Sequence, residues 1–107
     1  MREFLGEIGG NGATVLLRSD MDGLPIREES GEEFASVNGN MHACGHDMHA
    51  AILLGAAKML KEQEASLQGK VLLLFQSGEE PLKGAIEVVK QGVVDSVQAA
   101  FAMHVAS

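Results

Sequence analysis

The strongest constraint on the fold is an uninterrupted apolar run in the second half of the chain. Residues 69–77, GKVLLLFQS, contain five consecutive large apolar side chains. A strand with one face in solvent alternates apolar and polar residues, whereas a strand covered on both faces does not need to. The run therefore predicts a central strand of a sheet with other elements packed on both faces.

The segments around this strand alternate between strand and helix signals. Residues 2–8 and 13–19 read as strands, and the GGNG between them predicts that they pair as a β-hairpin. A helix is expected from Asp47, its predicted N-terminal cap, to residue 63. It is apolar around most of its circumference, which predicts burial on more than one side. A second helix over residues 85–92 and a buried strand over 97–105 follow.

Helices that alternate with apolar strands form crossover connections between parallel strands. The predicted fold class is therefore α/β: a mostly parallel sheet with flanking helices and an N-terminal β-hairpin. The chain is long enough for at most one domain, residues 1–107.

The charge and the apolar pattern argue against several partners. The formal net charge is −7 and no Lys/Arg stripe is present, so we expect neither nucleic acid nor an anionic membrane as a partner. The sequence contains no run of about 18 apolar residues, so we expect no membrane span, and no secretory signal is visible. The single cysteine cannot form an intrachain disulfide, so the expected location is the reducing cytoplasm.

That cysteine lies in an unusual cluster of polar residues. Three of the four histidines fall within eight positions of one another, and the cluster comprises His42, Cys44, His46, Asp47 and His49. Cys44 and His46 are two residues apart, which on an extended segment points both side chains the same way. They also precede a helix, where free N–H groups favour a thiolate.

Other polar residues follow the predicted strands. They are Asp20 and Asp22, the pair Glu79 and Glu80, and His104. In open α/β sheets, sites form outside the carboxyl ends of the strands, so these residues and the cysteine cluster are expected to meet there. A thiolate, imidazoles and carboxylates suit a transition-series dication better than Mg²⁺ or Ca²⁺. Of two adjacent glutamates, one can bind metal while the other accepts a proton from water.

Each residue also has an ordinary structural interpretation. Cys44 can be a small buried apolar residue, the glutamate pair a solvated loop, and His104 a hydrogen-bonded core histidine. Asp20 and Asp22 can simply shape a turn. The His-x-Cys-x-His spacing is not that of a zinc finger, although a purely structural zinc site stays open. What favours a functional site is that all these residues are expected at one edge of the sheet.

At these residues the chain resembles the M20 peptidase group of metal-dependent amidohydrolases. The similar subgroup is that of aminoacylase, hippurate hydrolase and indole-acetyl-amino-acid hydrolase. The resemblance rests on LRSDMDGLPIREESGEEFAS, MHACGHDMHAAILLGAAKML, GKVLLLFQSGEE and FAMHV, which together span essentially the whole chain in order.

The resemblance implies a role for each matching residue. Cys44, His46, Glu80 and His104 would bind metal, and Glu79 would be the general base. Asp20, His42 and Asp47 are the predicted supporting residues, and His49 is assigned either to orienting a ligand or to packing.

The resemblance also implies an activity and a domain organisation. We expect hydrolysis of N-acyl amino acids with a pair of divalent ions, Mn²⁺ or Zn²⁺, with Co²⁺ or Ni²⁺ tolerated. Such enzymes are several times longer, so residues 1–107 would be part of a catalytic domain, without the inserted smaller domain and the C-terminal part. The parent enzyme is a candidate homo-oligomer. The alternative is a catalytically inert α/β fragment that at most binds a divalent ion weakly.

Overall fold

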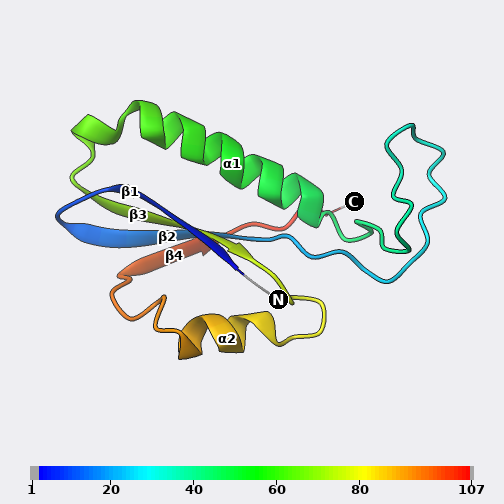
Figure 1. Cartoon of the computed structure of the whole chain (residues 1–107). Coiled ribbons are helices and arrows are strands. Elements are labelled where there is room, and N and C mark those ends of the chain that lie inside the picture. The colour runs from blue at the N-terminus through cyan, green and yellow to red at the C-terminus, as the bar shows by residue number, and fades with distance from the viewer. Residues whose placement is uncertain (1–2, 107) are drawn as a thin grey trace.

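The computed structural model describes residues 3–106, which form a four-stranded sheet between two helices (Figure 1). The elements in chain order are β1 (Phe4–Gly9), β2 (Ala13–Asp20), α1 (His46–Glu62), a 3₁₀ turn (Glu64–Ser66), β3 (Gly69–Gln76), α2 (Gly84–Lys90) and β4 (Ala99–Ala102). Helix α1 covers one face of the sheet and α2 covers the other (Figure 1). The α/β class with flanking helices is therefore confirmed.

The apolar run forms the central part of the core, as predicted. Leu72 and Leu74 of β3 pack on the α2 side, where they contact Val88. Leu73 points to the opposite side and packs with Leu53 of α1. Because successive side chains of a strand alternate between faces, an unbroken apolar run supplies a core to both layers at once.

The strand order is β1-β3-β2-β4. β2 pairs in parallel with both β3 and β4, and β1 pairs antiparallel with β3, so the sheet is mostly parallel as expected. The chain does reverse direction between β1 and β2 at the predicted glycines. The two strands do not pair with each other, however, because β3 lies between them. The predicted hairpin is thus present only in a split form.

The glycines of the β1–β2 connection explain why β3 fits between the strands. Gly9 and Gly12 adopt φ values of 85° and 125°. A Cβ atom at Gly9 would lie 2.2 Å from the carbonyl oxygen of Gly69, and one at Gly12 would lie 2.3 Å from that of Gln68. The connection therefore passes directly over the start of β3, a close backbone approach that only glycine permits.

The outer surfaces are more open than the sequence predicts. Of α1, the buried residues are His46, His49 and Leu53, while Met48 and Ile52 are exposed. All four residues of β4 are exposed as well. Burial of α1 on more than one side and of the last strand was therefore a wrong prediction. Within residues 3–106, α1 has the sheet on one side only and β4 is an edge strand.

A long excursion connects β2 to α1. Residues 21–45 extend beyond the end of the sheet (Figure 1) and are pinned at their base by two hydrogen bonds between the backbones of Leu24 and Met41. The excursion brings the cysteine cluster back to the carboxyl edge of the sheet. In the part of the chain described, no helix has the length and apolar character needed to cross a membrane.

Candidate metal centre

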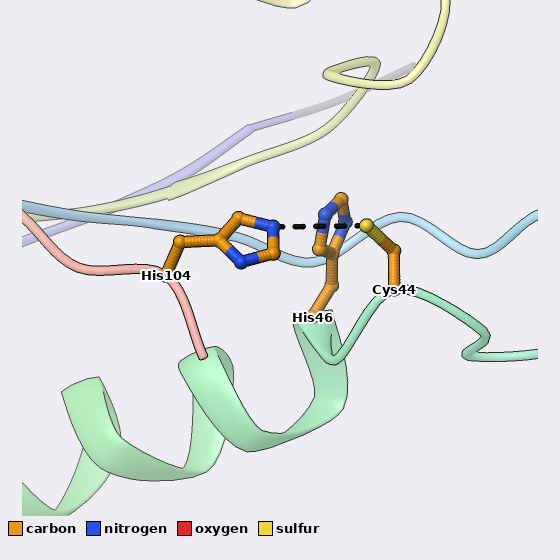
Figure 2. Close-up of side chains that lie close together, drawn as sticks. All are labelled: Cys44, His46 and His104. Atoms are coloured by element: carbon orange, nitrogen blue, oxygen red, sulfur yellow. Dashed lines mark hydrogen bonds between the residues drawn. The ribbon is translucent and has the colours of Figure 1, made fainter. Parts of the chain in front are cut away.

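Three separate segments bring the predicted ligands together at the carboxyl edge of the sheet. Cys44, His46 and His104 offer donor atoms that all lie within 4.8 Å of one another (Figure 2). Glu79 and Glu80, just after β3, approach the same point. Their carboxylate oxygens lie 3.7 and 3.6 Å from Nε2 of His46. These residues are distant in sequence, and the structure brings them together in space as predicted.

The turn that presents Cys44 and His46 depends on Gly45. This residue is the N-cap of α1 and has a left-handed conformation, with φ 81°. A Cβ atom there would lie 2.4 Å from Cγ2 of Val105. The predicted cap, Asp47, instead lies inside the first turn of the helix, so that prediction was wrong. Glycine is required because the backbone must turn sharply against the segment that carries His104.

His46 is held with one ring nitrogen aimed at the cluster. Its side chain is 1% exposed, and Nδ1 lies 3.0 Å from the carbonyl oxygen of Asp22 and 3.1 Å from Oδ1 of Asp22. Since both partners are acceptors, Nδ1 carries a proton, and in the neutral ring the lone pair is therefore on Nε2. Within residues 3–106 this buried Nε2 has no hydrogen-bond partner, and neither has the buried Oε1 of Glu80.

These two unpartnered atoms fit a divalent cation. Buried polar atoms without partners are rare because their desolvation costs free energy. Here an imidazole lone pair and a carboxylate oxygen are 3.6 Å apart, with the carboxylates of Asp20 and Glu79 within 3.7 Å of the same nitrogen. A dication would satisfy both atoms and offset the repulsion between the carboxylates.

Cys44 and His104 complete the set from the other side. Sγ of Cys44 lies 3.6 Å from Nε2 of His104, and Nδ1 of His104 donates to the carbonyl oxygen of Val105, which leaves Nε2 free to face the sulfur (Figure 2). The Glu80 carboxylate beside the thiol raises the pKa of Cys44, as do desolvation and nearby negative charge. Without an ion, the thiol therefore keeps its proton.

Asp20 lies beneath the cluster at the end of β2. It is 2% exposed; its Oδ1 accepts a hydrogen bond from Nδ1 of His49 and its Oδ2 accepts one from Arg18. Burial by itself would raise the pKa of Asp20, but the bond from His49 and the charge of Arg18 hold that pKa below its ordinary value. Asp20 is thus an ionised carboxylate 3.6 Å from Nε2 of His46.

Two of the predicted supporting residues lie elsewhere. His42 and Asp47 line a cavity of about 480 Å³ between the excursion and the start of α1, together with Glu28. The structure does not bring either of them into the groups of potential metal-binding side chains found in its described residues.

The sequence analysis expected Asp22 at this edge of the sheet but assigned it no role in the site. One carboxylate oxygen contacts Nδ1 of His46, and the other accepts a hydrogen bond of 3.0 Å from the backbone N–H of Glu80. It therefore braces two predicted ligands. Its spacing from Asp20, two residues further along an extended chain, was the available signal, but neighbouring Gly23 and Pro25 made a turn an equally good interpretation.

Comparison with known proteins points to one family. The family model for peptidase family M20/M25/M40 matches residues 16–107. An IAA-amino acid hydrolase of Arabidopsis thaliana, ILR1-like 5, is 49% identical over 105 residues, which are 96% of this chain and 24% of that protein. An N-acetyl-L-cysteine deacetylase of Bacillus subtilis is 50% identical over 94 residues, covering 87% of this chain and 23% of the relative.

A solved structure agrees in fold. The crystal structure of the Bacillus subtilis YxeP protein, described as a dinuclear metal-binding peptidase from the M20 family, superposes with a TM-score of 0.93 at 43% identity. The match covers 97% of this chain and 30% of that one. The chain thus spans about a quarter of the length of the curated relatives named above.

Proposed function

Because the chain belongs to peptidase family M20/M25/M40, we propose that it serves the hydrolysis of the amide bond of N-acyl amino acids at a pair of divalent metal ions. The observation that carries the proposal is the convergence of one thiol, two imidazoles and two carboxylates from three segments of the chain. The printed names of the relatives, an IAA-amino acid hydrolase and an N-acetyl-L-cysteine deacetylase, support an amide substrate of this class.

Cys44, His46, Glu80 and His104 are the residues that would hold the ions. Their mixture of sulfur, nitrogen and oxygen suits Mn²⁺ or Zn²⁺ and also accommodates Co²⁺ or Ni²⁺. When bound, such ions polarise a carbonyl group and make water more acidic. Asp22 keeps the Nε2 lone pair of His46 directed at the site, and Asp20 adds a buried negative charge below it.

Glu79 is the proposed general base. Its side chain is 34% exposed, against 25% for Glu80, so it is the glutamate more accessible to water and substrate. Its carboxylate takes a proton from the attacking water as the new C–O bond forms. It then gives that proton to the amide nitrogen as the C–N bond breaks, which releases a carboxylic acid and a free amino acid.

The remaining features of the proposal concern the parent protein. The similarity to much longer relatives favours a catalytic domain to which residues 1–107 contribute one part, with a smaller domain inserted later in the chain. Substrates would be small molecules, the expected location is the cytoplasm, and the parent enzyme is a candidate homo-oligomer.

A chimera provides the test of the proposed activity. The chain replaces the matching segment of the Bacillus subtilis N-acetyl-L-cysteine deacetylase, and hydrolysis of N-acetyl amino acids is measured after metal loading. Glu79→Gln is expected to lower turnover by about 10²–10⁴-fold, the usual contribution of a general acid–base, with the metal content unchanged.

The matched control is Glu62→Gln, at the end of α1, which should leave both turnover and metal content as they were. Equal turnover by the Glu79→Gln chimera would overturn the assignment of the base. If the 107-residue chain itself binds Co²⁺ but hydrolyses no amide, the alternative of a non-catalytic fragment describes it better.

A further inference from the structure

We propose that His49 is a positioning residue that sets where His104 stands relative to Cys44, and that it does so through its Nε2 atom. The inference rests on the proposed function, because it concerns how well the metal-binding residues are held. His49 was assigned from the sequence to orienting a ligand or to packing. The structure favours a specific orienting role for it.

Both ring nitrogens of His49 are occupied by protein partners. The residue is 4% exposed. Its Nε2 lies 2.9 Å from the backbone N–H of Val105, and its Nδ1 lies 2.5 Å from Oδ1 of Asp20. A backbone N–H can only donate, so Nε2 must be the unprotonated acceptor and Nδ1 must carry the proton that goes to Asp20. With neither nitrogen free, His49 is unable to bind a metal ion in this arrangement.

The hydrogen bond from Val105 holds the segment that carries His104. β4 ends at Ala102, and beyond that residue the chain leaves the sheet. Val105 is adjacent to His104, and its side chain packs so closely against Gly45 that a Cβ atom there would clash. The rings of His49 and His104 are in edge contact, with centroids 4.6 Å apart at 70°. His49 thus anchors this segment directly to α1.

This anchoring connects the two halves of the ligand set. Cys44 and His46 stand at the start of α1, whereas His104 comes from the far end of the chain. Their spacing, 3.6 Å between Sγ and Nε2, depends on how firmly residues 104 and 105 are held against the helix. Asp20, at the end of β2, fixes the ring of His49 through Nδ1. The two hydrogen bonds that join Asp20, His49 and Val105 therefore determine where His104 lies relative to Cys44.

Two substitutions separate the two bonds of the imidazole. His49→Gln carries a carbonyl oxygen about as far as Nε2 reaches, so it can still accept from Val105. His49→Asn is long enough to donate to Asp20 but too short to reach Val105. If His49 positions His104 through Nε2, the two variants must differ in metal affinity, although both remove the imidazole ring.

The experiment titrates the metal-free 107-residue chain with Co²⁺ and follows thiolate-to-cobalt absorption and calorimetric affinity. His49→Asn is expected to lower affinity by about 10–100-fold, as is usual when a residue that orients a ligand is lost, and to weaken the thiolate band. His49→Gln should stay close to the unsubstituted chain. In the metal-free state, exchange of the Val105 amide hydrogen should be faster in His49→Asn than in His49→Gln.

Leu53→Ala, one turn further along the buried side of α1, is the packing control. It should lower the free energy of unfolding without changing the cobalt spectrum. Equal affinity of His49→Asn and the unsubstituted chain overturns the inference, and so does an equal loss in all three variants, which indicates packing alone. An unsubstituted chain that binds no Co²⁺ overturns the metal centre itself.

Discussion

The two ring nitrogens of His46 have opposite tasks, and Asp22 is what separates them. Nδ1 contacts the Asp22 carboxylate, while Nε2 faces the carboxylates of Asp20, Glu79 and Glu80 without a hydrogen-bond partner in the described chain. A histidine that binds metal usually donates its other N–H to a carboxylate or carbonyl, which fixes its tautomer and its orientation. The arrangement of His46 therefore supports its proposed role as a ligand, with the ring already oriented before an ion would bind.

Asp22→Asn tests whether Asp22 orients the ring of His46. The carboxylate has an acceptor oxygen for Nδ1 of His46 and another for the N–H of Glu80, whereas an amide has only one acceptor oxygen. One of the two predicted ligands thus loses its hydrogen bond to the side chain of residue 22. We expect metal affinity, measured by calorimetry, to fall by about 10–100-fold. Asp95→Asn, on the exposed turn before β4, is the matched control, and unchanged affinity in Asp22→Asn would remove Asp22 from the site.

At the scale of the secondary-structure elements, the β1–β2 connection crosses closely over the start of β3. Gly12→Ala places a methyl group 2.3 Å from a backbone oxygen at a φ of 125°, which an L side chain rarely adopts. We expect the free energy of unfolding to fall by about 1–3 kcal/mol, the usual cost of such backbone strain. Urea denaturation measures this change.

Gly10→Ala is the control for that substitution, because a Cβ atom at Gly10 meets nothing within 4 Å. It should change the unfolding free energy by no more than about 0.5 kcal/mol. If both variants lost the same stability, the close approach of the connection to β3 would be the wrong explanation.

Much of this layout was predictable from local patterns. The strand over 13–19 is observed as Ala13–Asp20, the run at 69–77 as Gly69–Gln76, and the helix predicted from Asp47 begins at His46. Local patterns could not identify strand partners. A Gly-rich connection permits a tight hairpin turn and also permits another strand to pass beneath it, and the choice is made by residues some sixty positions away.

The same reasoning applies to the site. The rule that polar residues gather at the carboxyl ends of parallel strands correctly brought Cys44, His46 and His104 together. It could not separate Asp22 from a turn residue, because the contact with His46 depends on how the 21–45 excursion returns. Nor could it predict that Asp47 would point into a different cavity. The side chains that the returning excursion meets are determined by tertiary packing.

At the scale of the whole molecule, the centre lies where three separate parts of the chain meet. An ion held by Cys44, His46, Glu80 and His104 would join the start of α1, the end of β3 and the segment after β4. Binding to the folded state alone stabilises it by about 2.7 kcal/mol at a ligand concentration 100 times Kd. For a domain of this size we expect Tm to rise by roughly 10–20 °C.

This rise should depend on pH. The pKa of Cys44 is raised, so an ion must displace a proton from the thiol at neutral pH, and binding becomes stronger as pH increases. The shift in Tm on adding Zn²⁺ should therefore be larger at pH 8 than at pH 6, as scanning calorimetry would record. Cys44→Ser should make the shift in Tm smaller and remove most of its pH dependence. The same shift in the variant and in the unsubstituted chain would exclude the sulfur as a ligand.

The split arrangement of the first two strands also has a consequence for how the protein is made. Neither β1 nor β2 has a partner until β3 exists, and β3 ends 56 residues after β2. A ribosome adding about 5–20 residues per second needs roughly 3–11 s to cover that distance. Throughout that interval the nascent chain carries two strands without a partner strand. We therefore expect chaperones that hold unfolded chains to bind its early residues.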